Sequence, residues 1–318
     1  MQFKSLTEVA QYFNNEDKSR TFLEKMRWPD GRIVCPICGV VDAYRNGDCK
    51  TYKCRDKDCK TNFSVTVGTV LEGTKLPLVK WFMAMYLISA HKKGISSCQL
   101  GRDLNIGQKA AWFLNHRIRA MFGSGSFSFL TGMVEVDETY VGGKLANMHS
   151  KKRNELKEQN KDNKTPVMGM VQRDGKAKLQ VIGRKSFKTI VIENVKKEAI
   201  VITDSHSGYE GLNKEFADHQ AVNHSAFEYT RGIYYTNSVE GFFSNFKRMI
   251  FGTYHQLSEK HLQRYCDELT YRFNSRKIKD GERFVATFQN IQGRLTYDQL
   301  IGEGRKPKTK GIEFINGE

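Results

Sequence analysis

The stretch MVEVDETYVGGK, residues 133–144, decides the fold expected of this chain. It begins with alternating apolar and acidic residues, which is the pattern of a strand with one buried face. Val134 and Val136 are predicted to face a core. Glu135 and Asp137 then face the other way, since successive side chains of a strand alternate. A rigidly held carboxylate beside solvent suits a metal ligand and equally suits an ordinary surface acid.

Two later stretches also place an acid beside a hydrophobic element. AIVITD, residues 199–204, is a nearly unbroken apolar run, as expected of a strand buried on both faces, and it ends in Asp204. TNSVEGFFSNFKRMI, residues 236–250, carries apolar side chains at helical spacing. Glu240 and Lys247 lie two turns apart in this helix and therefore share another of its faces.

These acids carry a family resemblance. Asp137 on a first strand, Asp204 after a central strand and Glu240 on a later helix resemble the DDE transposases, whose catalytic domain is ribonuclease H-like. The phrases DETYVGGK, TDSHSGY, TNSVEGFFSNFKR and GTYHQLSEKHLQRYCDELTYRFNSR are similar to those of bacterial ISXO2-like insertion-sequence transposases, which join an N-terminal zinc ribbon to a DDE domain. The similarity runs from about residue 27 to 276, so several separate motifs agree in order and spacing.

Charge points to a polyanionic partner. The 318 residues include 51 Lys and Arg against 35 Asp and Glu, a formal charge of +16. Nucleic acid is favoured over membrane, and a merely soluble basic protein is the alternative. No stretch approaches the roughly 20 apolar residues of a membrane span, and the N-terminus lacks an apolar secretion core. We therefore expect a cytoplasmic protein, nucleoid-associated when it binds DNA, whose seven cysteines serve as metal ligands and not in disulfides.

Two close cysteine pairs predict a zinc ribbon. Cys35 and Cys38 form the first pair, and Cys54 and Cys59 form the second, which has a wider gap. Cys49 competes as a ligand, but the strand leading into Cys54 and the family pattern favour the second pair as written. A closed four-thiolate site is structural and leaves no position for substrate, and buried free thiols are the alternative.

The expected architecture is a multidomain α+β and α/β chain. Its parts are an N-terminal helical segment (1–30), a zinc ribbon (31–68), a helix-turn-helix-like DNA-binding module (69–126), a ribonuclease H-like mixed-sheet DDE catalytic domain (127–276) and a C-terminal tail (277–318).

Two basic regions are candidates for DNA contact. Helices are predicted over residues 96–104 and 108–122, and the second can enter a major groove, with Arg117 and Arg119 as DNA-binding candidates. Two packed helices are equally common in any all-α module. The second region, residues 144–166, is rich in lysine and poor in large apolar side chains, which predicts a solvated, mobile loop. Its DNA-binding candidates are Lys151, Lys152 and Arg153.

The catalytic part shows the element order that the resemblance implies. Strands are predicted over residues 167–173 and 178–183 around an Asp-Gly hairpin turn. A helix near residues 189–197 precedes the central strand, and a further strand is expected near residues 226–229. The resulting β-β-β-α-β order followed by a helix is that of a ribonuclease H-like domain.

The resemblance also implies the chemistry. Asp137 would bridge two Mg²⁺ (or Mn²⁺) ions, with Asp204 and Glu240 each completing one site for phosphoryl transfer on DNA. Nearby acids compete for these roles: Glu135, Glu138 and Asp218.

Glu240 has an alternative role, because it lies three residues after Asn237, the spacing of a helix capping box. Lys247 stands where many DDE enzymes have a basic residue that contacts DNA. Arg248, His206 and Asn237 are further DNA-binding candidates, although a turn histidine without such a role fits His206 as well.

The sequence therefore predicts an insertion-sequence transposase that binds terminal inverted repeats, cleaves DNA and transfers the 3′-OH end to target DNA. Synapsing two ends calls for at least a homodimer. A non-catalytic zinc-ribbon DNA-binding regulator derived from a transposase is one alternative. A metal-dependent nuclease without strand transfer is another.

Overall fold

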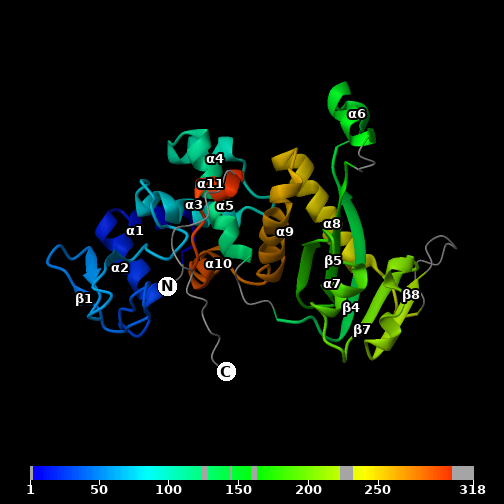
Figure 1. The fold of residues 1–318 in the computed structure, drawn as a ribbon, viewed down its shortest axis with the longest axis horizontal. Helices are drawn as coiled ribbons and strands as arrows, with labels where there is room; N and C mark the ends of the chain where they lie inside the picture. Colours follow the sequence, from blue (N-terminus) through cyan, green and yellow to red (C-terminus); the bar gives the residue numbers. More distant parts are fainter. Residues whose placement is uncertain (1–2, 124–127, 144, 159–162, 223–231, 303–318) are drawn as a thin grey trace. The chain divides into compact units, whose positions relative to one another are not determined.

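The structure is a computed structural model that describes residues 3–123, 128–143, 145–158, 163–222 and 232–302 (Figure 1). The strand expected near residues 226–229 lies outside these ranges. The chain divides into two compact units, and each of them is built from stretches that are separated in the sequence. No helix in the described ranges is both long and apolar enough to cross a membrane.

The first unit comprises Met1–His91, Ser97–Gly125 and Lys279–Glu318. The sequence predicts a tail from residue 277 with short helices near residues 284–291 and 297–301, and the structure shows α10 (Asp280–Thr287) packed within this unit on α3 (Leu78–Ala90). The burial of aromatic side chains explains why α10 packs on α3. The rings of Phe284 and Phe288, four residues apart, are both buried and pack edge-on against Phe82 of α3.

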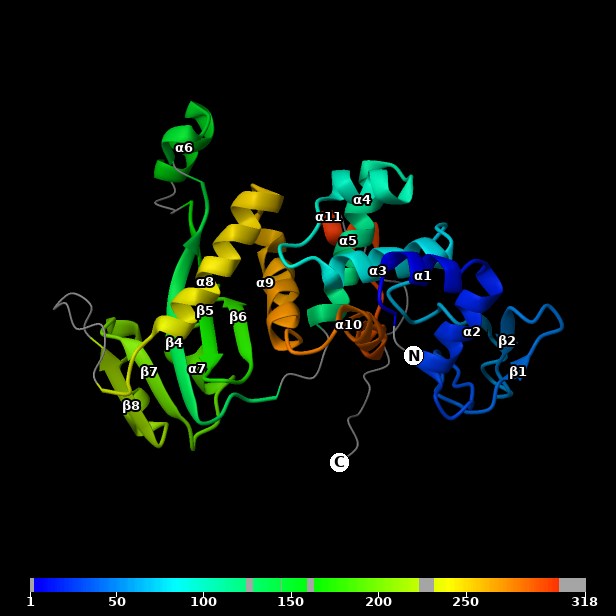
Figure 2. The same cartoon turned by 180° about the vertical axis from the view of Figure 1, so that it is seen from behind.

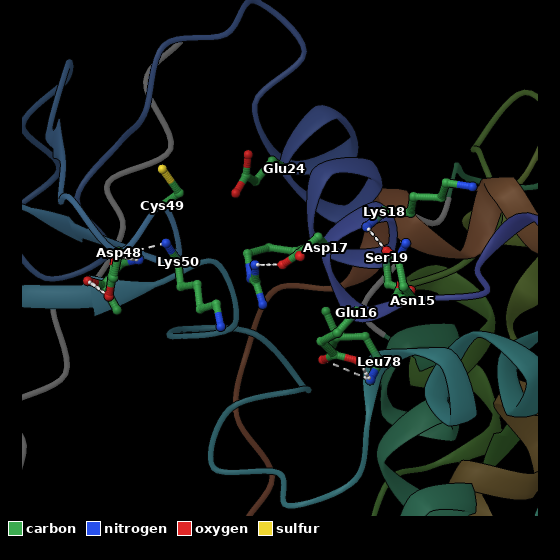
Figure 3. Close-up of polar contacts among 12 residues, drawn as sticks. Asn15, Glu16, Asp17, Lys18, Ser19, Glu24, Asp48, Cys49, Lys50 and Leu78 are labelled. Carbon is green, nitrogen blue, oxygen red and sulfur yellow. Dashed lines mark hydrogen bonds and ion pairs between the residues drawn. The ribbon is translucent and has the colours of Figure 1, made fainter.

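Helices α1 (Leu6–Tyr12) and α2 (Glu16–Arg27) confirm the predicted helical N-terminus. The side chain of Asn15 caps α2 by accepting a hydrogen bond from the third residue of the helix (Figure 3). The carboxylate of Glu16 accepts from the backbone N–H of Leu78, with distances of 3.0 and 3.2 Å. This bond satisfies an N–H at the start of α3, whose N-cap is a proline without a side-chain acceptor.

The ribbon is a small antiparallel sheet of β1 (Tyr44–Arg45), β2 (Thr51–Lys53) and β3 (Asn62–Ser64). Tyr52 of β2 is fully buried, and its hydroxyl donates to the carboxylate of Glu24 on α2. Helix α2 therefore packs with the ribbon and belongs to the same structural module.

The predicted helix pair is present as α4 (Ser97–Leu104) and α5 (Gln108–Gly123). Asn105 in the connecting turn adopts a left-handed conformation with φ of 48°, which asparagine tolerates better than most residues. A short helix, α11 (Tyr297–Ile301), ends the described part of this unit.

The second unit, Lys92–Ser96 and Ser126–Ile278, is built on a mixed five-stranded sheet with strand order β6-β5-β4-β7-β8 (Figures 1 and 2). Its strands are β4 (Met133–Val141), β5 (Thr165–Gln172), β6 (Ala177–Val181), β7 (Ile200–Asp204) and β8 (Asp218–Val222). β5 is antiparallel to both neighbours, while β7 and β8 run parallel to β4 and to each other. The sheet has the ribonuclease H-like order that the resemblance implies, but its fifth strand is β8 at residues 218–222 and not the strand expected near residues 226–229.

The two faces of this sheet are covered by different helices. Val134 and Val136 pack on the face covered by α7 (Phe187–Ile192), as the alternation in β4 predicts. The opposite face is covered by α8 (Asn237–Met249) and α9 (Glu259–Asn274), whose apolar side chains form a separate core. Glu135 and Asp137 belong to this second face.

The lysine-rich segment after β4 contains a helix, α6 (Ser150–Glu158), which lies beyond the ends of β4 and β5 (Figures 1 and 2). The prediction of a solvated loop is therefore wrong for residues 150–158. Their side chains bury little, but Lys, Arg, Glu and Leu all have high helix propensity, so the backbone is helical without a core beneath it.

Candidate active site

The first two predicted acids lie side by side on neighbouring parallel strands, Asp137 in the middle of β4 and Asp204 at the end of β7. β4 and β7 pair with Glu135 opposite Ile202. Continuing this register by two residues places Asp137 opposite Asp204, across a strand spacing of about 4.8 Å. Both carboxylates are half-buried. The parallel strands thus bring together two acids that are 67 positions apart in the chain.

The third acid comes from α8, which crosses the sheet close to Asp137. Gly169 of β5 pairs with Asp137, and a Cβ added to Gly169 would lie 2.7 Å from the ring of Phe243 on α8. The absent side chain allows this close approach. Glu240 lies in the first turn of α8 and is exposed. The close approach of α8 at Gly169 brings the first turn of α8, which contains Glu240, near the middle of β4, where Asp137 lies.

The charges of Asp204 and Glu240 both act on Asp137. The pKa of Asp137 is raised to about 7, mainly because burial disfavours its charged form. The negative charges of Glu138, Asp204 and Glu240 raise it further, against the opposing effect of the backbone N–H of Glu138. A divalent cation would relieve this repulsion, and carboxylate oxygens are the ligands that Mg²⁺ and Mn²⁺ prefer.

The spacing of the acids bears on the number of ions. Across the residues that the structure describes, only the four ribbon cysteines have three or more ligand atoms all within 4.8 Å of one another. The acids are therefore more widely spread than the ligands of one compact ion.

Glu135 is excluded as a metal ligand by its own hydrogen bonds. It is fully buried, and its Oε1 accepts from Arg173 Nε at 2.8 Å and from Ser238 Oγ at 2.9 Å. Its Oε2 accepts from the backbone N–H groups of Ser238 and Val239, at 2.7 and 3.2 Å. A carboxylate offers about four acceptor positions, and all are occupied. Sequence reasoning placed Glu135 on the correct face but missed these partners.

Glu135 also replaces the predicted cap of α8. The N-cap residue of this helix is Thr236, and no side chain of the helix itself caps it, so the capping box of Asn237 and Glu240 does not form. Asn237 is the first helical residue and is exposed. Two of the N–H groups at the start of α8 are instead bound by Glu135 from β4, and the carboxylate of Glu240 accepts from the hydroxyl of Thr236 at 3.5 Å.

The other competing acids point away from the site. Glu138 accepts from the hydroxyl of Tyr209 at 2.7 Å on the opposite face of β4. Asp218 pairs with Ile200 at the start of β7, four residues before Asp204. That separation is about 13 Å along a strand. Both acids are thereby excluded from the site formed with Asp137.

The second candidate metal site lies in the ribbon. The Sγ atoms of Cys35 and Cys59 are 3.9 Å apart, and those of Cys38 and Cys54 are 3.4 Å apart. A tetrahedral zinc site with Zn–S bonds of about 2.3 Å has S–S edges of about 3.8 Å, so the four thiols fit one Zn²⁺ ion. Cys49 is exposed in the turn before β2 and is not part of this group (Figure 3).

Comparisons with known proteins match both the segment that forms the ribbon and the segment that carries the acids. The family model for the ISXO2-like transposase domain matches residues 129–274, and that for the transposase zinc-ribbon domain matches residues 14–62. A transposase-like protein of Haemophilus influenzae is 30% identical over 90 residues, which are 28% of this chain and 72% of that protein. This chain belongs to the ISXO2-like transposase family. A protein in the transposable element ISH50 of Halobacterium salinarum is 27% identical over 256 residues, 75% of this chain and 84% of its own length.

In this transposase-family chain, a histidine lies beside the acids. His206 is exposed, its ring stacks on Phe187 with centroids 5.2 Å apart, and its backbone N–H donates to Asp204. Its Nδ1 accepts from the backbone N–H of Gly208 at 3.0 Å. An accepting Nδ1 leaves the proton of the neutral ring on Nε2, which can donate to a phosphate oxygen.

The predicted basic residues of the transposase fall into two groups. Those on α6 and α8 are accessible: Lys247, Arg248 and Lys151 are exposed, Arg153 is half-buried, and the side chain of Lys152 lies outside the described part of the chain. Arg117 and Arg119 are only 4% and 2% exposed, so the prediction that they bind DNA is wrong for this structure. Arg117 donates to the carbonyl of Glu72 at 2.6 Å and lies over the ring of Trp81.

Proposed function

We propose that this chain is the transposase of an insertion sequence, binding terminal inverted repeats and catalysing DNA strand cleavage and 3′-OH strand transfer. The convergence of Asp137, Asp204 and Glu240 from two parallel strands and a crossing helix carries this proposal. Membership in the transposase family supports it, as does the occurrence of a relative in the transposable element ISH50.

Each acid has a distinct position in the proposed site. Asp137 is half-buried and would bridge two ions, while Asp204 and Glu240 would each complete one coordination site. When bound, two Mg²⁺ or Mn²⁺ ions would activate the attacking oxygen and stabilise the leaving oxygen of an in-line phosphoryl transfer. The strands β4 and β7 would hold Asp137 and Asp204 rigidly, so the oxygens would be arranged before DNA arrives.

The accessible cations would hold the DNA backbone near this site. Lys247 lies two helical turns beyond Glu240, beside Arg248, and both are exposed on α8. The charged face of α6 with Lys151 and Arg153, and the Nε2–H of His206, would add phosphate contacts. With a formal charge of +16, the chain would bind DNA in a strongly salt-dependent way.

The remaining parts would recognise DNA ends and assemble the complex. The zinc ion would fold the ribbon and take no part in catalysis, since four thiolates leave no open coordination position. The ribbon and the α4–α5 pair would read the terminal inverted repeats. Because two ends must be cut together, the active form would be at least a homodimer.

Strand cleavage and joining with duplexes from the flanks of the gene tests the proposal. With Mg²⁺, the wild type is expected to cut at one position and join the new 3′ end to a second duplex, while Asp137→Asn only binds. Cutting without joining would instead identify a metal-dependent nuclease. Tight binding without chemistry from either protein would identify a DNA-binding regulator.

A further inference from the structure

The buried pair of Glu135 and Arg173 connects the sheet to the helix that carries Glu240. Glu135 lies two residues before Asp137 on the same face of β4, and it binds the N–H groups of Ser238 and Val239. Glu240 is the next residue of α8. The contact between Glu135 and α8 is therefore adjacent to the place where Asp137 and Glu240 share a site.

Because of this adjacency, the contact between Glu135 and α8 constrains where Glu240 lies relative to Asp137. Two residues along a strand span about 6.6 Å, so Glu135 fixes where the first turn of α8 lies relative to Asp137. The N–H groups it binds are among the orphan donors at the positive end of the helix dipole, which favours a full negative charge at this place. A neutral amide in place of the Glu135 carboxylate could accept hydrogen bonds only at its carbonyl oxygen, because its NH₂ group is a donor and would face other N–H donors.

Arg173 fixes the same turn from the other side. Its Nε donates to Glu135, its Nη1 donates to the carbonyl of Ile233 at 2.6 Å, and its Nη2 donates to that of Tyr235 at 3.2 Å. The guanidinium also lies 3.7 Å from the centroid of the Tyr235 ring. Arg173 thus ties Glu135 to the backbone that enters α8.

We infer that Glu135 and Arg173 are positioning residues, which set the place of Glu240 relative to Asp137 and thereby the metal affinity of the acidic site. This inference rests on the proposed function, because it takes Asp137, Asp204 and Glu240 as the metal ligands. The pair itself touches neither metal nor substrate. It acts through the first turn of α8.

Conservative variants test the inference, with a buried ion pair elsewhere in the same unit as a control. Glu135→Gln and Arg173→Lys keep size and much of the packing, and the contact of Phe243 over Gly169 still holds α8 on the sheet. The control, Glu268→Gln, breaks the buried pair of Glu268 and Arg272 within α9. All variants are full-length, and the metal probe is Mn²⁺ titrated without DNA and followed by calorimetry.

Glu135→Gln is expected to raise the Mn²⁺ concentration at half-saturation by about 10–100-fold, the usual effect of losing a group that orients a ligand. Single-turnover cleavage at subsaturating Mn²⁺ should fall in parallel, with DNA affinity unchanged. Amide hydrogen exchange at Ser238 and Val239 should accelerate. Arg173→Lys should give an intermediate effect, because lysine keeps the charge but not the fork that reaches two carbonyls.

Unchanged Mn²⁺ half-saturation in Glu135→Gln would overturn the inference, as would an equal shift in Glu268→Gln, which would mark a general loss of stability. The exchange measurement reads the position of α8 even without catalysis. Normal Mn²⁺ binding without strand cleavage in the wild type would overturn the proposed function alone. Absence of Mn²⁺ binding by the wild type would overturn both.

Discussion

The two candidate metal sites of this chain are assembled in opposite ways. The ribbon site takes its four thiols from two short local pairs, within 25 consecutive residues, Cys35–Cys59. The acidic site takes one carboxylate each from β4, β7 and α8, at positions 137, 204 and 240. The first site is closed and suits a structural ion. The second is spread and partly exposed, so it suits ions that meet a substrate.

The difference also shows in what surrounds each site. Local knuckles orient the ribbon thiols, whereas Glu240 depends on a distant strand residue, Glu135, and on the close approach of α8 at Gly169. A closed site can form as its own module folds. An open catalytic site needs separate elements to be held in register, which requires buried polar contacts outside the ligand set.

The largest expected effect comes from breaking the ribbon site. Cys35→Ser should abolish stoichiometric zinc binding and unfold the ribbon, because structural zinc contributes about 10–16 kcal/mol to folding in small zinc modules. Zinc content and thermal unfolding measure this loss. Cys49→Ser is the matched control and should behave as the wild type, since Cys49 lies outside the cluster. Equal zinc loss in both variants would contradict the assignment.

Breaking the acidic site should have the reverse effect, removing chemistry but not the fold. Asp137→Asn should lower strand cleavage by at least about 10²–10³-fold, the scale for losing one group that stabilises transition-state charge. Its melting temperature without metal should equal or exceed that of the wild type, because the substitution relieves repulsion from Asp204 and Glu240. Cleavage assays and calorimetry measure the two effects. A clear drop in melting temperature would mean that Asp137 serves the fold.

Crowding the approach of α8 should affect both stability and catalysis. Gly169→Ala should destabilise the second unit by about 1–3 kcal/mol, because the new methyl group would press on the ring of Phe243. Cleavage should also fall, since α8 and Glu240 would move away from Asp137. Denaturant unfolding measures the first effect.

Gly241→Ala is the control for the alanine substitution itself. Nothing lies within 4 Å of the added methyl group, and the residue is helical. This variant should gain about 0.5–1 kcal/mol of stability from helix propensity. If Gly241→Ala lowered the free energy of unfolding as much as Gly169→Ala, the close approach of α8 to Gly169 would not be the cause of the loss.

The smallest predicted effect is a pH dependence away from both metal sites. Burial raises the pKa of Asp267 on α9 to about 6, above its ordinary value of 3.8. The folded state therefore binds more protons than the unfolded state between these values, and stability falls as pH rises through this range. Asp267→Asn should therefore be more stable than the wild type above pH 6 and equal to it near pH 3.5. A gain that does not change with pH would contradict this origin.

Local sequence patterns predicted much of the fold, and they succeeded where a residue's structure depends on its near neighbours in the chain. The cysteine pairs and the alternation of Val134 and Val136 depend on near neighbours, and the structure confirms their placement. The order of the sheet follows from the family resemblance. The capping box at Asn237 failed because a residue about a hundred positions away, Glu135, takes the helix N–H groups instead. No local pattern reveals such a partner.

The other errors share this cause. Arg117 and Arg119 were placed on a DNA-binding surface because helical periodicity separates them from the apolar stripe. In the structure, residues 114–119 of α5 are all buried, the two arginines among them. Phe284 and Phe288 were assigned to a tail because their packing partner, α3, lies about 200 residues earlier. Burial set by distant segments is the information that a single sequence does not carry.

The most direct test of the account is a crystal of the full chain soaked in Mn²⁺ and examined by anomalous scattering. Two peaks about 3.5–4 Å apart are expected, with Asp137 contacting both ions and Asp204 and Glu240 one each. Glu135 should keep its contacts with Arg173 and α8 and touch neither ion. No peak at these acids, or a peak coordinated by Glu135, would contradict it.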